Sequence, residues 1–202
     1  MSRAGVTDDP GADRKTGHRV CPWWLGYVLA SPLRRMMQDP ASIVEPYVRP
    51  GMTVLEPGPG MGFFTPELAR RVGPTGHVVA VDIQSRMISG LKRRLARAGL
   101  LERVDARLGT TNSLSLGDLN GRVDFTLAMA VVHEMPSGSW FFGQMAAAMK
   151  PGGTLLLAEP SGHVSDAKFQ AEMEEAISAG FEVVERPAIR RSQAALLRKK
   201  AA

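Results

Sequence analysis

Three glycines at alternate positions follow an acidic residue in the segment VLEPGPGMGFFTPEL, residues 54–68. The acid is Glu56, and the glycines are Gly58, Gly60 and Gly62. Glycine at every second position lets a backbone turn sharply and lets a ligand approach its amide groups closely. The apolar residues before Glu56 indicate the end of a buried strand, and those after Gly62 recur at helical spacing. A loop between a strand and a helix is where α/β proteins bind nucleotide-like ligands.

Two ligand classes suit a loop of this kind, dinucleotides and S-adenosylmethionine. The dinucleotide fingerprint places its third glycine three positions after the second, where this chain has Phe63. The Phe63 side chain would crowd the close packing of helix on strand that glycine permits there. The spacing therefore disfavours a dinucleotide.

The pattern acid-x-Gly-x-Gly-x-Gly, here EPGPGMG, resembles the first motif of the class I S-adenosylmethionine-dependent methyltransferases. The segment VVAVDIQSRMI resembles the second strand of that family, and VDFTLAMAVVHEMP resembles its fourth strand with the following loop. AMKPGGTLLLAEP is similar to the helix, turn and fifth strand of the small-molecule branch, which includes the methyltransferases of ubiquinone and menaquinone biosynthesis. The four motifs occur in the family's order over residues 45–198.

The resemblance implies S-adenosylmethionine as the cofactor. It places Glu56 near the methionine ammonium of that cofactor, directly or through water, although Glu56 could instead only cap the following backbone. Gly58, Gly60 and Gly62 would let the chain pass under the amino-acid and ribose parts. Met129, at the end of the fourth strand, would border the methyl group that is transferred.

The resemblance also assigns the nucleoside part of the cofactor. Asp82 would accept hydrogen bonds from both ribose hydroxyls, and Ile83 would pack on the adenine ring. In many relatives an acid after the third strand contacts the adenine amino group, whereas this chain has Thr110 there, within LGTTNSL. Thr110, Thr111 or Asn112 would make that hydrogen bond as neutral groups.

His133 and Glu134 are the candidates for a catalytic role. A general base is needed only if the acceptor's nucleophile arrives protonated. A histidine after the fourth strand is common in this branch and often structural, and Glu134 could be a surface acid only. No Asp, Glu or His positions have the spacing of a metal-dependent methyltransferase, so we expect no metal.

The segment HRVCPWWLGY holds candidates for acceptor binding, namely Cys21, Trp23, Trp24 and Tyr27. The family builds its acceptor pocket from N-terminal helices and from the loops after strands four and five. The aromatic side chains would then cover the acceptor. The alternative is that they anchor the N-terminal helices on the sheet, as large aromatic residues often do.

Short apolar runs that alternate with helical patterns predict an α/β fold, a Rossmann-like and mostly parallel seven-stranded sheet with helices on both faces. The chain divides into a polar, disordered tail (1–17), an N-terminal helical cap (18–50) and the methyltransferase domain (51–202). We expect strands near 52–56, 77–82, 104–108, 123–129, 153–159, 181–186 and 193–198. We expect helices near 63–72, 85–98, 139–149 and 166–179, and a further helix after Asp39 with a stripe of Ile43, Val44, Tyr47 and Val48.

Composition bounds the class of protein. The chain has 202 residues, of which 44% are hydrophobic, as expected for one globular domain. A single cysteine excludes a disulfide within the chain and fits a reducing cytosol. The apolar run 20–33 contains proline and glycine and follows aspartates, which argues against a secretory signal. We therefore expect a cytoplasmic, soluble monomer or homodimer with no membrane partner.

The leading prediction is an enzyme that methylates a small, fairly apolar molecule by in-line displacement. Arsenite is disfavoured as the acceptor because its methylation requires several cysteines. The net charge of +5 leaves open an RNA or other nucleic-acid methyltransferase. The Asn-Pro-Pro-aromatic motif for exocyclic amines and the Pro-Cys nucleophile for cytosine are both absent, which argues against nucleic acid. The third alternative is a module that binds the cofactor without catalysis.

Overall fold

The computed structural model describes residues 38–201. The predicted tail and most of the predicted helical cap lie outside these residues, as do Cys21, Trp23, Trp24 and Tyr27. No helix in the described part of the chain is long and apolar enough to cross a membrane.

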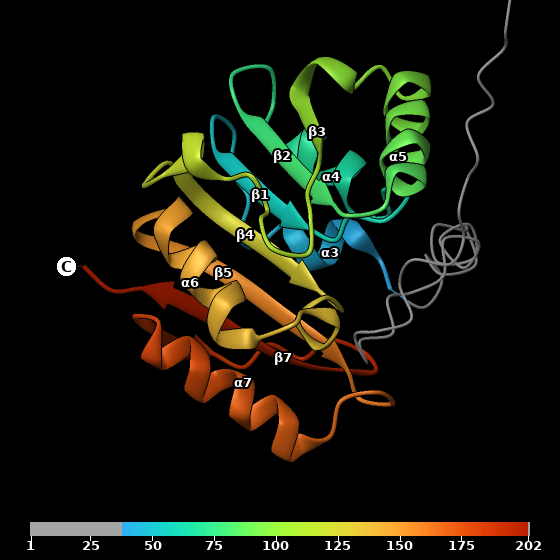
Figure 1. Cartoon of the computed structure of the whole chain (residues 1–202). Helices are drawn as coiled ribbons and strands as arrows, with labels where there is room; N and C mark the ends of the chain where they lie inside the picture. The colour runs from blue at the N-terminus through green and yellow to red at the C-terminus, as the bar shows by residue number, and fades with distance from the viewer. Residues whose placement is uncertain (1–37, 202) are drawn as a thin grey trace, which may run out of the picture.

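A seven-stranded sheet forms the middle layer of the molecule (Figure 1). Its strand order is β3-β2-β1-β4-β5-β7-β6, and neighbouring strands run parallel as far as β5. β7 is antiparallel to both β5 and β6. The mostly parallel sheet that the sequence predicts is therefore confirmed. The strands are β1 (Thr53–Pro57), β2 (His77–Asp82), β3 (Val104–Leu108), β4 (Val123–Met129), β5 (Met149–Pro160), β6 (Phe181–Glu185) and β7 (Ser192–Lys199).

Helices cover both faces of the sheet because successive strand residues point to opposite sides. Val54 packs with residues of the helices on one face, and Leu55 packs with those on the other. The first face carries α3 (Pro40–Val44), α4 (Thr65–Arg71) and α5 (Ser85–Arg97). The second face carries α6 (Gly138–Ala148) and α7 (Asp166–Ser178). Three 3₁₀ turns complete the described elements, η1 (Leu101–Arg103), η2 (Gly117–Leu119) and η3 (Val132–Glu134).

Two elements differ from the prediction. α3 ends at Val44, so the expected apolar stripe is only partly helical. Pro46 has no N–H to donate to the carbonyl four residues earlier, which stops the helix. Tyr47 still stacks on Phe125, with ring centroids 5.9 Å apart. β5 starts at Met149, before the expected position, because Met149 already pairs with Val123 of β4.

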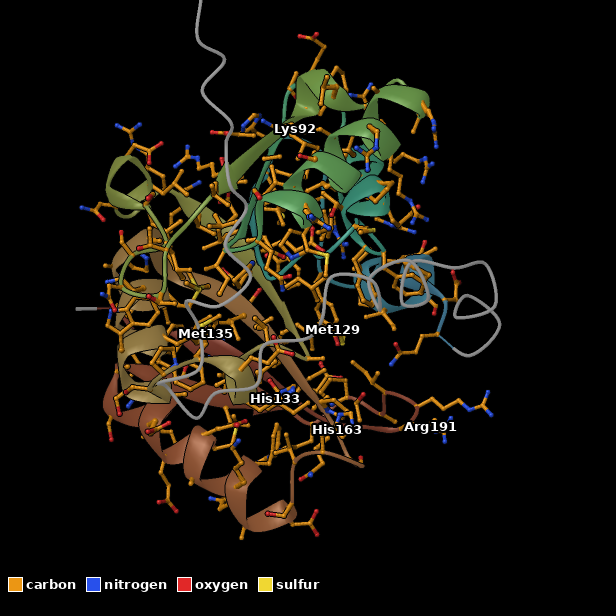
Figure 2. The ribbon with its side chains drawn as sticks, turned by 45° about the vertical axis from the view of Figure 1, so that its right-hand side comes forward. Lys92, Met129, His133, Met135, His163 and Arg191 are labelled. Atoms are coloured by element: carbon orange, nitrogen blue, oxygen red, sulfur yellow. The ribbon has the colours of Figure 1, made fainter. Side chains whose placement is uncertain are left out.

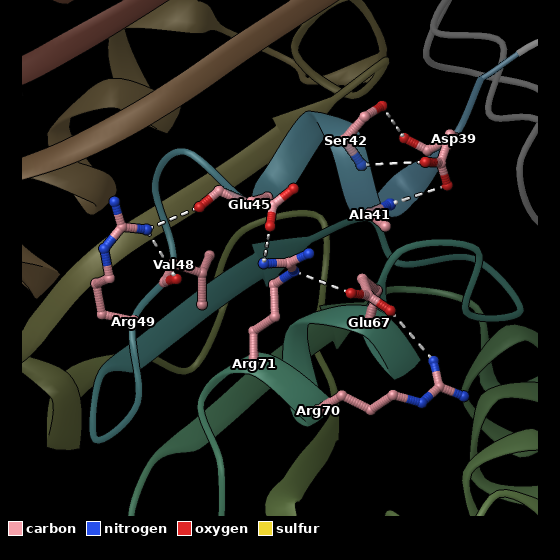
Figure 3. Close-up of polar contacts among 9 residues, drawn as sticks. All are labelled: Asp39, Ala41, Ser42, Glu45, Val48, Arg49, Glu67, Arg70 and Arg71. Carbon is pink, nitrogen blue, oxygen red and sulfur yellow. Dashed lines mark hydrogen bonds and ion pairs between the residues drawn. The ribbon is translucent and has the colours of Figure 1, made fainter.

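Polar contacts join α3 to α4 (Figure 3). The carboxylate of Asp39 caps α3 by accepting hydrogen bonds from the amides of Ala41 and Ser42 at 3.2 and 3.3 Å. Arg71 on α4 lies 3.6 Å from Glu45 and donates a 2.9 Å hydrogen bond to Glu67. The start of the described chain is thereby tied to the helix that follows the glycine loop.

Candidate functional site

The loops after β1, β2 and β4 meet at the carboxyl edge of the parallel strands. The amide of Gly58 donates to the carbonyl of Val81 at 2.9 Å, and the amide of Gly60 donates to Asp82 Oδ2 at 3.2 Å. Asp82 Oδ1 accepts from the amide of Gln84 at 2.9 Å. Asp82 therefore links the glycine loop to the turn after β2, where the amide of Ile83 also interacts with its carboxylate.

The three glycines of the loop have positive φ angles, and two of them are also closely packed. A Cβ atom on Gly58 would lie 2.7 Å from Cγ2 of Val131, and one on Gly62 would lie 2.6 Å from Cδ1 of Leu91. Beside Gly60, by contrast, a Cβ would meet no atom of the described residues within 4 Å. The loop thus packs tightly at its two ends and has open space at its middle.

A cavity lies beside the glycine loop and opens to solvent, and its empty space of about 290 Å³ includes part of that solvent. Among its lining residues, only Glu56 has an ionisable side chain, and the others offer backbone or apolar surface. Glu56 is 3% exposed, and its Oε2 atom has no hydrogen-bond partner among the described residues. The cavity is lined by Glu56, Pro57, Gly58, Pro59, Phe63, Phe64, Leu127 and Met129.

The Glu56 carboxyl group is unusual in its titration. Burial raises its pKa to about 7, and the negative charge of Asp82 acts in the same direction. The nearby hydroxyl of Thr65 acts in the opposite direction, although no partner lies within hydrogen-bond geometry of that hydroxyl in the described part of the chain. A buried acid with an unused oxygen at a cavity wall is a suitable partner for a cationic ligand group. The residues present therefore fit the ammonium end of S-adenosylmethionine.

The residues predicted to contact adenine do not line the cavity. Ile83, the residue after Asp82, is half-buried. Gly109, at the end of β3, donates its amide to the carbonyl of Asp82 at 2.9 Å. Thr110 forms a bridge with Ser113, and Thr110, Thr111 and Asn112 are exposed. Burial of Asp82 raises its carboxyl pKa.

The loop after β4 begins with a strained residue. Met129 lines the cavity, and Ala130, directly after it, has a φ of +55°, a conformation that residues other than glycine seldom adopt. Ala130 donates its amide to the carbonyl of Ala158 on β5 at 2.7 Å. Backbone strain of this kind is maintained only where surrounding contacts fix it, and it occurs often at functional sites.

One carboxylate holds the residues that follow. Glu159, near the end of β5, has a fully buried side chain. Its Oε1 atom accepts hydrogen bonds from the amides of Val131 and Val132 at 3.2 and 2.8 Å. Its Oε2 atom forms a short hydrogen bond with Nδ1 of His133. This bond raises the pKa of His133, although burial opposes the change.

A second buried acid lies near this pair, on α7. Glu172 is 4% exposed, and neither of its carboxyl oxygens has a hydrogen-bond partner within residues 38–201. Burial raises its pKa to about 7, and the charge of Glu159 contributes. The ring of His163 lies 6.3 Å from that of His133 between centroids. Figure 2 shows Met129, His133 and His163 together at the carboxyl edge of the sheet.

The structure thus brings together many of the residues that the sequence singles out. Glu56, the glycine loop and Met129 border one cavity, Asp82 is bonded to that loop, and His133 follows on the next loop. Glu134 is half-buried on η3 beside His133 and raises its pKa. No cluster of His, Cys, Asp or Glu in the described residues has the arrangement of a metal site.

The sequence interpretation missed Glu159 and Glu172. The sequence does contain a signal for Glu159, because this acid directly follows the apolar run LLLA. It lies near the carboxyl end of β5, the strand that pairs with β4. Glu172 had none, because it lies on an ordinary helical segment with charged neighbours.

The fold and this site define an α/β protein of the methyltransferase class, with a cavity at the carboxyl edge of β1 and β4. Residues 49–196 match the family model described as "Methyltransferase domain". The chain belongs to this family, whose cofactor is S-adenosylmethionine.

Relatives and solved structures agree with that membership. The chain is 34% identical over 110 residues to an arsenite methyltransferase of Halobacterium salinarum, covering 54% of this chain and 27% of that protein. It is 30% identical over 148 residues to a ubiquinone biosynthesis O-methyltransferase of Paramagnetospirillum magneticum, covering 73% of this chain and 55% of the relative. The chain therefore spans about half or less of these curated relatives.

The fold is similar to that of a SAM-dependent methyltransferase from Aquifex aeolicus. The TM-score is 0.78 at 22% sequence identity, and the match covers 89% of this chain and 98% of the other. At this level of identity the likeness concerns the fold.

Proposed function

We propose that this protein transfers the methyl group of S-adenosylmethionine to a small, fairly apolar acceptor by in-line displacement. The observation that carries the proposal is the buried Oε2 atom of Glu56, which has no hydrogen-bond partner within residues 38–201 and lies in a cavity of otherwise apolar and backbone surface. An ammonium group would supply a positively charged hydrogen-bond donor for this oxygen. The cofactor brings an activated methyl group, so the protein has to position the acceptor and exclude water.

We propose the following roles for the residues of the cofactor site. Glu56 would hold the ammonium group, and the open space beside Gly60 would receive the amino-acid and ribose parts of the cofactor. The Asp82 carboxylate would accept hydrogen bonds from the ribose hydroxyls, while Ile83 and one of Thr110, Thr111 and Asn112 would contact adenine. Met129 would face the sulfur and its methyl group. All of these are testable by binding of S-adenosylhomocysteine, the product form.

The cofactor assignment is tested by calorimetry with S-adenosylhomocysteine. Asp82→Ala should weaken binding by about 1.5 to 3 kcal/mol, the range for hydrogen bonds to a charged group. Glu102→Gln, an exposed change on η1 at the opposite end of β3, is the matched control and should leave affinity unchanged. Undiminished affinity in Asp82→Ala would remove Asp82 from the site. A preference for NADH over S-adenosylhomocysteine would contradict the cofactor assignment.

The acceptor is tested by a screen with labelled S-adenosylmethionine against small thiols, phenols, amines and quinone precursors. Transfer to one of these classes supports the proposal. Binding of cofactor without transfer to any acceptor would favour the alternative of a binding module. Arsenite is included as a negative case, because the chain has one cysteine although a relative is an arsenite methyltransferase.

The N-terminal aromatic residues remain the predicted cover of the acceptor. The double change Trp23→Ala and Trp24→Ala should leave cofactor affinity within a few-fold and raise the Michaelis constant for the acceptor, because small-molecule pockets are lined mostly by apolar side chains. Loss of folding would instead make these residues anchors of the core. Unchanged transfer would direct the search to the loops after β4 and β5.

RNA is the second candidate acceptor, on one observation. α5 exposes Lys92, Arg93 and Arg97, and no ion pair is found for these three among the described residues. Basic surface of this kind attracts polyanions, although exposed helices are often basic for solubility alone. Co-purification with nucleic acid that is lost with added salt would support this candidate.

A further inference from the structure

One arginine holds the segment that connects β3 to β4. Arg107, on β3, donates hydrogen bonds from Nη1 and Nη2 to the two carboxylate oxygens of Asp118 on η2, both at 2.7 Å. Its Nη1 also donates to the carbonyl of Ser115 at 3.0 Å, and its Nε donates to Asp105 Oδ2 at 2.7 Å. A guanidinium binds a carboxylate through two parallel bonds, a geometry that an ammonium group cannot reproduce. Arg107 therefore ties the connecting segment to the strand at the edge of the sheet.

The bonds of Arg107 reach this segment at a strained residue. Ser115 has a φ of +53°, a conformation that residues other than glycine seldom adopt. Its amide donates to Ser113 Oγ at 3.1 Å, and its carbonyl accepts from Arg107. Leu114 and Leu116, on either side of it, are buried in the core. Because strain of this kind persists only where surrounding contacts fix it, the core and Arg107 together hold this half of the segment.

The first half of the segment starts at the edge where the cofactor is proposed to bind. Gly109 donates its amide to the carbonyl of Asp82 at 2.9 Å, and a Cβ on Gly109 would lie 3.0 Å from Cγ1 of Val81. A turn of residues 110–113 follows, closed by two backbone hydrogen bonds of 2.8 and 3.3 Å between its first and last residues. The polar side chains proposed to meet adenine are exposed on this turn. The turn thus lies between an anchor at Asp82 and an anchor at Arg107.

We propose that Arg107 is a positioning residue for the cofactor. By holding Ser115 and Asp118, it keeps the turn 110–113 in the arrangement that receives the nucleoside. This proposal rests on the proposed binding of S-adenosylmethionine. Arg107 acts through the turn and does not itself contact the ligand. A turn that is ordered before binding raises affinity, because no molecules have to be recruited from other arrangements of the turn.

The ion pair is too exposed to decide whether the protein folds. The side chains of Arg107 and Asp118 are 20% and 57% exposed. The hydrogen bond from Arg107 lowers the pKa of Asp118, so this carboxylate is ionised and paired at neutral pH. Exposed ion pairs contribute little to the free energy of unfolding, because water competes for both groups and two side chains lose freedom. Variants of this pair should therefore fold, and their ligand affinity can be measured.

The first variant is Arg107→Lys. Lysine keeps the positive charge, but its single ammonium group cannot hold two carboxylates and a carbonyl in the same geometry. Calorimetry with S-adenosylhomocysteine should show about a tenfold loss of affinity, as expected when the turn keeps its binding arrangement in about a tenth of the molecules. The matched control is Arg198→Lys, because Arg198 on β7 likewise binds an acid of the neighbouring strand, Glu182, at 2.7 Å. The control should bind as wild type does, and unchanged affinity in Arg107→Lys would overturn the proposal.

The variant Asp118→Asn tests whether the two residues act together. Asparagine replaces one carboxylate oxygen by an NH₂ group, which cannot accept a hydrogen bond from the guanidinium. Asp118→Asn should also weaken binding of S-adenosylhomocysteine. The double variant should bind no more weakly than Arg107→Lys alone, because both changes break the same contact. Additive losses would overturn the claim that Arg107 acts through Asp118.

A second ligand separates the nucleoside from the amino-acid part of the cofactor. Methylthioadenosine has the adenine and the ribose but neither the ammonium group nor the carboxylate. Arg107→Lys should weaken the binding of methylthioadenosine and of S-adenosylhomocysteine by similar factors, whereas Glu56→Gln should weaken only S-adenosylhomocysteine. A purely structural role of Arg107 would not produce this division between ligands. A loss confined to S-adenosylhomocysteine in Arg107→Lys would overturn the role in holding the nucleoside.

Hydrogen exchange of the free protein tests the order of the turn without any ligand. The amides of Thr110 and Ser113, which are bonded across the turn, should exchange faster in Arg107→Lys than in the wild type. Equal exchange rates in the two proteins would overturn the proposal. Binding of neither ligand by the wild type would contradict the proposed function itself, whereas wild-type binding with unchanged affinity in Arg107→Lys would contradict only the role of Arg107.

Discussion

At the scale of single residues, the site is built around acids whose burial sets their chemistry. In the described part of the chain, Oε2 of Glu56 and both carboxyl oxygens of Glu172 lack hydrogen-bond partners, and burial raises the pKa of each acid to about 7. Glu159 is equally buried but accepts three hydrogen bonds. Hydrogen-bond partners therefore distinguish Glu159, which fixes a loop, from Glu56 and Glu172, which remain available to bind a proton or a ligand.

Binding of the cofactor should release a proton from Glu56. Near pH 6.5 this carboxyl group is largely protonated in the free protein, since its pKa is raised to about 7. An ammonium beside it favours the carboxylate, so affinity for S-adenosylhomocysteine should rise between pH 5.5 and 8. Calorimetry at pH 6.5 in buffers of different ionisation enthalpy measures the proton release directly.

Glu56→Gln provides the check on that expectation. The variant should bind S-adenosylhomocysteine more weakly, and fewer protons should leave the protein on binding. The exposed change Glu102→Gln should behave as wild type. Equal proton release by the wild type and Glu56→Gln would assign the proton to another group.

At the scale of elements, the glycine loop was the most predictable part of the molecule. Its spacing, the strand before it and the helix after it are local features, and the structure has all three. The link between Glu159 and His133 was not predictable, because it joins side chains 26 positions apart through the pairing of β4 with β5. The predicted acceptor residues Cys21, Trp23, Trp24 and Tyr27 lie outside the described residues and stay predictions. Pro46 is visible in the sequence, but the predicted helix, with its apolar stripe, continued past this residue.

Two glycine substitutions should separate packing from backbone conformation in this loop. Gly58→Ala and Gly60→Ala both place a side chain at a positive φ angle, which costs about 1 to 2 kcal/mol. Only Gly58→Ala also drives a methyl group to within 2.7 Å of Val131, so it should destabilise the protein by clearly more. Gly60→Ala should instead weaken cofactor binding. Chemical denaturation and calorimetry measure the two effects, and equal destabilisation would contradict the packing argument.

At the scale of the whole molecule, several raised pKa values act on folding in one direction. Glu56, Glu172, Asp82 and His133 all hold their protons more tightly in the folded protein than in the unfolded chain. Where the folded state binds more protons, the free energy of unfolding decreases as pH rises. The direction of this change is the same for the acids and for His133. The ionised form of each acid is disfavoured in the interior, and His133 loses its charged bond to Glu159 when it is deprotonated.

The free protein should therefore be more stable near pH 5 than near pH 8. The contribution of each buried acid is complete below its unfolded pKa of about 4.5 and is lost as pH rises to about 7. The contribution of His133 is complete below the ordinary histidine pKa of 6.5 and is lost as pH rises through the higher pKa of this residue in the folded protein. Each of Glu56 and Glu172 contributes at most about 3 kcal/mol, since one pKa unit corresponds to 1.36 kcal/mol.

Urea unfolding at fixed ionic strength from pH 5 to 8 measures the decline, and Glu56→Gln with Glu172→Gln should flatten it, because glutamine resembles the protonated acid at every pH. The exposed control Glu102→Gln should leave the slope unchanged. A stability that rises between pH 5 and 8 in the wild type would show that these acids are already ionised in the folded protein, and would also remove the physical basis for proton release on cofactor binding.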